Sequence, residues 1–327
     1  MVAAAALAVR FVPVTNHAVL TLAVLSGFLT TAAGVATVIL IFLRRRRTAV
    51  LAAALTVAAA AVQLPWFIGP EPTAPNSVAV RVLTANVSEG TADPAVLAAV
   101  MRANADIVLF QELTPALVDG LTRTGVGAYF PHQVTDARPS ANGVGIWSRW
   151  PVGSPARIPE YELGVVTADV DIPGTPAPTT VVTAHISGPW PQPITQWRRE
   201  MDLLPQTVQD IVDRAGTRPV IVGGDFNATT DMAPFRQALR PGVRDAAEQA
   251  GAGLIHTFPA NAAFPPVIGI DHVLTYHGSA TSAHSVRIPG SDHLGLLAEV
   301  ALSDVVEPLA SGVRAGGLAV ATYDRHT

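Results

Sequence analysis

One stretch decides how this chain folds: Pro219-Val220-Ile221-Val222-Gly223-Gly224-Asp225-Phe226-Asn227. Its β-branched run predicts a buried strand, and the two glycines that follow predict a break in that strand. Because side chains alternate along an extended chain, Asp225 and Asn227 are expected to point into the same space at the carboxyl end of the strand. Proteins of the α/β class usually place their chemistry at such strand ends. Taken alone, the segment also fits an ordinary turn.

Polar side chains end or interrupt the other predicted strands as well. Apart from His272, two histidines lie near carboxylates, a pattern that suits charge neutralisation and proton transfer at a phosphate. Oxygen ligands in a chain without cysteine favour Mg²⁺ or Mn²⁺ over zinc. Adjacent residues on a strand face opposite sides, so His272 is expected to lie away from Asp271 and to be structural. The residues at these strand ends are Asn86, Gln111, Glu112, His185, Asp271, His272 and the run Ser291-Asp292-His293.

The order of predicted elements indicates the class of fold. Helices are predicted over 93–104, where Asp93 is the N-cap, and over 194–215, where apolar residues recur at helical spacing. Several predicted strands follow one another without a helix between them, which favours a mixed-sheet α/β sandwich over a doubly wound parallel fold. Besides the strand that ends at Asp225, strands are predicted over 78–87, 106–112, 142–147, 165–172, 179–186, 267–274 and 294–302.

These motifs, in this order, resemble those of the endonuclease/exonuclease/phosphatase superfamily, which has the DNase I-like fold. The turn Ser148-Arg149-Trp150-Pro151 is similar to a serine-arginine-x-proline turn of the same group. The resemblance covers about Val78 to Leu302. It implies a four-layer α/β sandwich, with two mixed β-sheets flanked by helices, and divalent-metal-dependent hydrolysis of a phosphoester.

The resemblance also implies a set of metal ligands. Glu112 would be the principal ligand, with help from Asn86, and Asp292 would support this metal or a second one. The expected cofactor is Mg²⁺, with Mn²⁺ as the alternative.

Five further residues carry the catalytic roles that the resemblance implies. Asp225 would orient or deprotonate the attacking water, and Asn227 would hold the phosphate or the nucleophile. His185 would donate a hydrogen bond to a phosphate oxygen. His293 would form a dyad with Asp271. The choice between Asp225 and His293 as the catalytic base stays open at this point.

The chain before residue 70 has the composition of a membrane anchor. Hydrophobic residues make up 49% of the chain and charged residues only 14%, against about 25% charged in soluble domains. The segments 18–43 and 48–68 each exceed the roughly 18–20 apolar residues that a transmembrane helix needs. The arginines at 44–47 predict a cytoplasmic loop by the positive-inside rule. Residues 1–17 form a shorter apolar segment, read as an extra span or an interfacial segment, with a cleaved signal peptide as the alternative.

This topology predicts a multi-pass protein of the cell membrane with its catalytic domain outside the cytoplasm. Residues 69–76 form a proline-rich linker, which is expected to be stiff and extended. The catalytic domain is predicted over 77–304, and residues 305–327 are read as a flexible tail.

Charge bears on which phosphate ester is the substrate. Residues 77–304 contain 14 arginines, no lysine and 22 acidic residues, a net charge of −8 with neutral histidine. Nucleases gain much of their affinity by neutralising backbone phosphates, which an acidic domain does poorly. Tethering to the bilayer raises the local concentration of lipids instead. The sequence therefore favours a lipid-linked, envelope or small phosphate ester.

Two other functions remain compatible with the sequence. One is an extracellular endonuclease or exonuclease, although nucleic acid is the less favoured substrate. The other is a catalytically inactive binding module. The presence of every motif residue argues against this second function. The expected partners are the lipid bilayer and the phosphate-ester substrate, and the sequence indicates no obligate protein partner.

Overall fold

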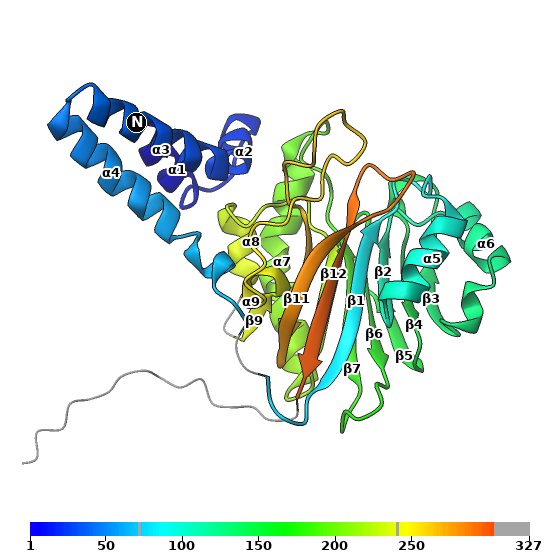
Figure 1. The fold of residues 1–327 in the computed structure, drawn as a ribbon. Coiled ribbons are helices and arrows are strands. Elements are labelled where there is room, and N and C mark those ends of the chain that lie inside the picture. Colours follow the sequence, from blue (N-terminus) through cyan, green and yellow to red (C-terminus); the bar gives the residue numbers. More distant parts are fainter. Residues whose placement is uncertain (71–72, 240–241, 304–327) are drawn as a thin grey trace, which may run out of the picture.

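A computed structural model describes residues 1–70, 73–239 and 242–303. The predicted tail over 305–327 lies outside the described residues, as does part of the predicted linker. Within them, the chain after residue 77 forms two mixed β-sheets that pack face to face (Figure 1). The predicted mixed-sheet sandwich is thus confirmed.

The first sheet carries the early motifs. Within the described residues it has six strands, and its one parallel pair is β1 with β2. Side by side, its strands are β11 (Gly278–Arg287), β12 (Leu294–Leu302), β1 (Val78–Asn86), β2 (Ile107–Gln111), β4 (Val144–Ser148) and β3 (His132–Asp136).

The second sheet carries the stretch that ends in Asp225. It also has six strands in the described part of the chain, with β7 and β8 as the parallel pair. Side by side, its strands are β5 (Val152–Arg157), β6 (Gly164–Val170), β7 (Thr179–His185), β8 (Val220–Asp225), β10 (Asp271–Tyr276) and β9 (Val243–Asp245).

Helices cover the outer face of each sheet and complete the four layers. Apolar residues of α5 (Pro94–Asn104) and α6 (Pro115–Arg123) pack on the first sheet, and those of α7 (Ile194–Ala215) and α8 (Ala233–Ala238) pack on the second. Short elements in the connections are α9 (Ala246–Gln249), η1 (Leu64–Phe67), η2 (Val126–Ala128) and η3 (Ser140–Asn142).

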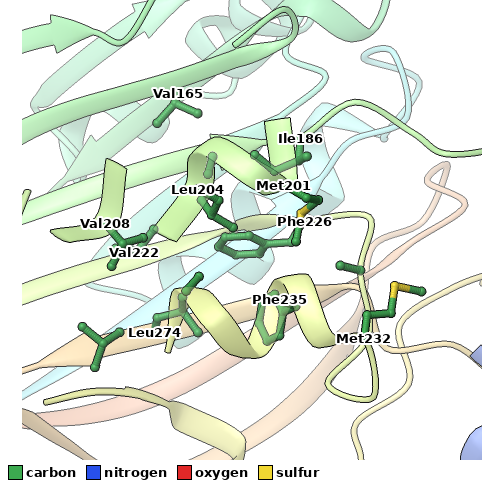
Figure 2. Packing of buried hydrophobic residues seen from close by; sticks show 14 of the residues in the cluster. Val165, Ile186, Met201, Leu204, Val208, Val222, Phe226, Met232, Phe235 and Leu274 are labelled. Atoms are coloured by element: carbon green, nitrogen blue, oxygen red, sulfur yellow. The ribbon is translucent and has the colours of Figure 1, made fainter. Parts of the chain in front are cut away.

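Local sequence signals explain these helices. The side chain of Asp93 accepts the backbone N–H groups of Ala95 and Val96, so it caps α5 as predicted. In α7, the apolar residues at helical spacing are buried against the second sheet, and Trp197 and Met201 are fully inaccessible to solvent. Figure 2 shows this core around Phe226, with Met201 and Leu204 close by.

One predicted strand begins later than expected. The strand predicted over 267–274 starts only at Asp271, since the preceding residues form a single bridge, Phe258 to Ile268. Their backbone groups are used elsewhere: the carbonyl of Ile268 accepts from Thr257 and Phe258, and that of Ile270 accepts from Phe226. These bonds hold the loop against the end of β8 instead of extending β10.

The N-terminal segment is helical, but its helices differ in extent from the predicted spans. The helix expected over 18–43 is broken into α2 (His17–Val24) and α3 (Ser26–Phe42), with a bend of 62°. The break falls at Leu25, next to the pair Ser26-Gly27, a combination that commonly kinks helices, and the Ser26 hydroxyl donates to Asp231 of the sandwich.

The helix expected over 48–68 is α4 (Arg46–Ala61), which stops earlier than predicted. Pro65 explains the early end, because its ring clashes with the carbonyl four residues before it and it has no N–H to donate. A shorter helix, α1 (Val2–Val9), precedes them. Among the described residues, no individual helix has the length and hydropathy needed to cross a membrane, whereas α2 and α3 together meet both criteria as a bent pair.

The N-terminal helices share a core with the sandwich. Val9, Val14, Leu20 and Ala23 belong to the same buried apolar cluster as Trp197 of α7. Figure 1 shows α2 beside the sandwich, while α3 and α4 project away from it. The N-terminal segment is thus packed on the catalytic domain in addition to being joined to it by the chain.

Candidate active site

The strand directions bring the predicted residues to one end of the sandwich. The parallel strands β1 and β2 end together with Asn86 beside Gln111. The parallel strands β7 and β8 likewise end with His185 beside Asp225. β10 runs antiparallel to β8, so it begins there, with Asp271 opposite Asp225. The antiparallel strand β12 begins just after His293 for the same reason.

Glu112 and Asn86 meet at the end of the first sheet. Glu112 has a left-handed backbone (φ 58°), which turns it out of β2 into the site. Its carboxylate accepts the Asn86 amide at 3.1 Å and the backbone N–H of Glu89 at 2.7 Å. Burial raises the pKa of Glu112 despite these bonds. The site therefore holds a carboxylate whose negative charge is short of a positive partner.

Asn86 links the two sheets. Its amide nitrogen also donates to Asp225 Oδ2 at 3.0 Å, and its side-chain oxygen accepts the N–H of Ser88 at 2.9 Å. In this arrangement Asn86 orients the carboxylates of Glu112 and Asp225. Its predicted role as a metal ligand stays a prediction.

The backbone turns sharply after Asp225, and here the structure differs from the predicted alternation of side chains. Asn227 is not extended but left-handed (φ 48°), and its N–H donates to Asp225 Oδ1 at 2.8 Å. Its amide nitrogen donates to the carbonyl of Ile186 at 3.0 Å. Phe226 between them is fully buried and anchors the turn in the apolar core (Figure 2). The two polar residues therefore lie at the site because of this turn.

His293 and Asp271 form the predicted dyad. His293 Nδ1 lies 2.9 Å from Asp271 Oδ2, and His293 Nε2 lies 3.8 Å from Asp225 Oδ2. Burial alone would lower the pKa of His293, but the charge and the hydrogen bond of Asp271 raise it to about 10. Burial and the neighbouring Asp271 raise the pKa of Asp225 to about 6. At neutral pH, His293 thus holds its proton while Asp225 is largely ionised.

His185 lies between the two carboxylates of the site. Its Nε2 is 3.6 Å from Asp225 Oδ2 and 3.9 Å from Glu112 Oε1. Burial lowers the pKa of His185. Its Nδ1 lies 3.2 Å from the carbonyl of Ala141, which only accepts, so the neutral ring carries its proton on Nδ1. Donation from Nε2 to a phosphate oxygen, the predicted role, therefore requires a second proton.

Two groups of residues in the site could hold a metal ion. Ligand atoms of Asp225, Asp271 and His293 lie within 4.8 Å of one another. However, a metal bound to His293 Nδ1 would displace the proton that the ring shares with Asp271. Glu112 is a better fit on chemistry, since its side chain is 18% exposed and the charge of His293 only partly offsets the effect of burial on its pKa.

Asp292 lies at the margin of the site. Its side chain is partly buried, and its negative charge acts on both Glu112 and His293. The neighbouring Ser291 is a further positioning group, because its hydroxyl donates to the Asn86 carbonyl at 2.8 Å and accepts the N–H of His293 at 2.9 Å. The predicted metal role of Asp292 stays a prediction.

His272 lies on the opposite side of β10 from Asp271, as predicted from strand alternation. Its Nδ1 is 2.7 Å from Asp245 Oδ2, and its Nε2 is 3.0 Å from the carbonyl of Ala228. His272 thus forms a second buried pair that braces the chain just after Asn227. The sequence carries no local signal for Asp245, which is far from His272 along the chain.

Comparisons with known proteins agree with this geometry. The model of the Endonuclease/Exonuclease/phosphatase family matches residues 83–293. The chain belongs to this family and is a hydrolase that acts on phosphoric ester bonds. Enzymes of the family typically depend on a divalent metal. None of the curated proteins compared with the chain matches it.

Solved structures share the fold at low identity. A humanized D. rerio TDP2 is 19% identical with a TM-score of 0.57, and the match covers 68% of this chain and 98% of that one. D. rerio TDP2 complexed with single strand DNA product is 20% identical with a TM-score of 0.56, over the same shares of the two chains. An endonuclease/exonuclease/phosphatase from Bacteroides vulgatus is 18% identical with a TM-score of 0.56, covering 69% and 100%. These similarities concern the fold.

Proposed function

We propose that this chain is a membrane-anchored, divalent-metal-dependent phosphoesterase that hydrolyses a lipid-linked, envelope or small phosphate ester at the outer face of the membrane. The observation that carries the proposal is the contact between apolar helices and the end of the sandwich that holds the site. Arg10 pairs with Asp231, four residues after Asn227, and the Ser26 hydroxyl donates to the same carboxylate.

The apolar surface of α3 and α4 supports an anchor. Together they expose Val35, Val38, Ile39, Ile41, Phe42, Val50, Leu51 and Val57. A surface of this kind on a soluble protein would be expected to bind a partner or a membrane. α3 has 17 residues, about 25 Å of helix at 1.5 Å per residue, which approaches the roughly 30 Å hydrocarbon core of a bilayer. Four arginines follow at 44–47, as expected at the cytoplasmic end.

In the proposed reaction, Asp225 is the base. With a pKa of about 6, it is ionised at neutral pH and can accept a proton from water. His293 keeps its proton and donates from Nε2 to the phosphate, while Asp271 holds the ring through Nδ1. Glu112, with Asn86 and Asp292 nearby, would hold the metal. A divalent cation bound there would neutralise charge that develops on the phosphate oxygens.

A nuclease is the second candidate. One observation favours it: a structure with this fold is D. rerio TDP2 complexed with single strand DNA product. The net charge of −8 over residues 77–304 argues against extensive contact with a nucleic acid backbone. An inactive binding module is less favoured still, because the dyad, Asp225 and Glu112 lie together with polar partners that hold them.

One assay set tests the proposal. The intact protein in lipid vesicles, with Mg²⁺ or Mn²⁺, is offered a lipid phosphate, a lipid diphosphate, a chromogenic phosphodiester and plasmid DNA. We expect turnover of the lipid substrates that is lost in Asp225→Ala. Cleavage of plasmid without turnover of any lipid would make the protein a nuclease. Absence of turnover with every ester would refute the enzymatic proposal.

A further inference from the structure

Two loops border the active site on the side that faces the N-terminal helices. We infer that these loops, residues 187–193 and 258–270, dip into the bilayer surface and admit a substrate phosphate carried by a membrane lipid. We call Trp190 and Phe264, with their loops, the apolar rim. This inference rests on the proposed membrane phosphoesterase and specifies its substrate as lipid-embedded.

Both loops touch the catalytic residues. The first begins two residues after His185, and a Cβ added at Gly188 would lie 3.8 Å from Asn227 Oδ1. In the second, the ring of Phe258 lies 4.9 Å from the ring of His293, and the N–H of Ala260 donates to the carbonyl of Asp292 at 2.6 Å. The two loops that carry Trp190 and Phe264 therefore adjoin the site.

The rim exposes aromatic side chains to solvent. Trp190 is 68% exposed and Phe264 is 54% exposed. Large aromatic rings gain free energy when they leave water, and tryptophan is enriched where membranes meet water. The loops contain no charged residue, so nothing in them opposes contact with the headgroup and acyl boundary.

The rim is continuous with the proposed anchor. His17, at the start of α2, donates from Nε2 to the Pro189 carbonyl at 2.9 Å and packs edge-on against Trp190, with ring centroids 4.9 Å apart. Phe28 of α3 stacks on His256 at the entrance to the second loop, at 6.1 Å. His17 thus contacts the first loop, and Phe28 packs just before the start of the second. In the proposed arrangement, the rim then lies where the anchor meets the bilayer.

Charge favours a bilayer over a nucleic acid as the occupant. A strand of nucleic acid would need cationic side chains along its path, and neither loop has one. The opposite border of the site is polar: Glu89 lies there beside Glu112, and Arg138 pairs with Asp136 at 2.8 Å. Among the described residues, these two borders of the site therefore differ: the border beside the N-terminal helices is apolar, and the opposite border is polar.

The absence of cysteine from the chain makes a direct test possible. Trp190→Cys and Phe264→Cys each give a single thiol for an environment-sensitive fluorophore, and Tyr129→Cys is the matched control, because Tyr129 is also 54% exposed but lies near the end of α6. The intact labelled proteins are placed in phosphatidylcholine vesicles. We expect blue-shifted emission and quenching by a lipid-borne quencher at 190 and 264, and neither at 129. Water-like emission at both rim positions would overturn the inference.

Kinetics supply the second readout. In vesicles that contain phosphatidic acid, the double variant Trp190→Ala/Phe264→Ala should lower kcat/KM for that lipid by about tenfold or more, with turnover of a soluble chromogenic phosphodiester unchanged. Equal losses on both substrates would mean that the rim is only structural. A selective loss on single-stranded DNA would make it a platform for bases. If the parent protein hydrolyses neither ester, the proposed function fails, whereas the fluorescence result still decides where the rim lies.

Discussion

Asp271 holds His293 through a 2.9 Å contact between Oδ2 and Nδ1, and its other oxygen, Oδ1, is buried without a hydrogen-bond partner among the described residues. The carboxylate thus directs its interaction at a single ring nitrogen. Such an arrangement holds the proton of the imidazole and leaves Nε2 facing Asp225.

The dyad predicts how Asp271→Asn will behave. The amide keeps the shape but removes the charge that raises the pKa of His293 to about 10. We expect activity to fall by about 10²–10⁴-fold, and the alkaline limb of the pH–rate profile to move to lower pH, since His293 then loses its proton more easily. Measuring kcat/KM as a function of pH for the parent and the variant tests this expectation. An unchanged alkaline limb would show that protonated His293 is not required.

The proposed role of Glu112 as a metal ligand predicts how activity depends on the metal concentration. Glu112→Gln removes the negative charge at the end of β2, so the metal concentration for half-maximal activity should rise at least about tenfold. Chelation should abolish the activity of the parent protein, and added Mg²⁺ or Mn²⁺ should restore it. Glu89→Gln is the matched control, because Glu89 is exposed and contributes its backbone N–H to the site. Equal metal requirements in both variants would remove Glu112 from the ligand set.

Asp106 predicts a loss of stability in acid. Its carboxylate accepts Arg81 at 2.8 Å and pairs with Arg149 at 3.4 Å. Burial opposes ionisation, but the hydrogen bonds and charges of these arginines lower the pKa of Asp106. Its stabilisation is therefore present above the unfolded pKa and is lost as pH falls through the lower folded value.

We expect Asp106→Asn to reduce the free energy of unfolding by about 1–3 kcal/mol at neutral pH. The difference from the parent should shrink at a pH low enough to protonate Asp106 in the folded parent, because the parent then also lacks the charge. Urea denaturation at neutral and strongly acid pH measures it. A difference that does not depend on pH would point to packing and not to charge.

The buried pair of His272 and Asp245 predicts that mutations of these two residues have non-additive effects on stability. His272→Ala leaves a fully buried carboxylate without its partner, at a cost of about 3–5 kcal/mol. Asp245→Asn should retain the cap on Ala247 of α9 while weakening the pair. The double variant should be more stable than the sum of the single losses implies. Strict additivity in denaturation would mean that the two residues do not stabilise each other.

The N-terminal helices should detach when Asp231 is lost. Asp231→Ala leaves Arg10 buried without its carboxylate and removes the acceptor of Ser26. Limited proteolysis should then cut the exposed segment near Phe11 and Val12 faster, while the sandwich stays resistant. Asp171→Ala, at an exposed acid, is the control. Equal cleavage rates would show that the polar contact does not hold the helices in place.

The sequence by itself determined the class of fold, because strands and helices are local. The β-branched run before Gly223, the cap at Asp93 and the apolar spacing in α7 each act over a few residues. The carboxyl ends of β7 and β8 were therefore visible, and with them the candidates His185 and Asp225, whereas Asp271 was expected inside a longer strand than the one that forms. Where a local signal was overlooked, as with Pro65, the predicted helix ran too far.

Only the tertiary structure decided how those residues meet. The bond from Asn227 to the Ile186 carbonyl, the pairing of Asp245 with His272 and the docking of Arg10 on Asp231 join parts of the chain that are far apart in sequence. Such contacts form because buried charges and polar groups must find partners once the sheets have packed. The apolar rim beside the site, formed by two loops far apart in sequence, is visible only in the folded chain for the same reason.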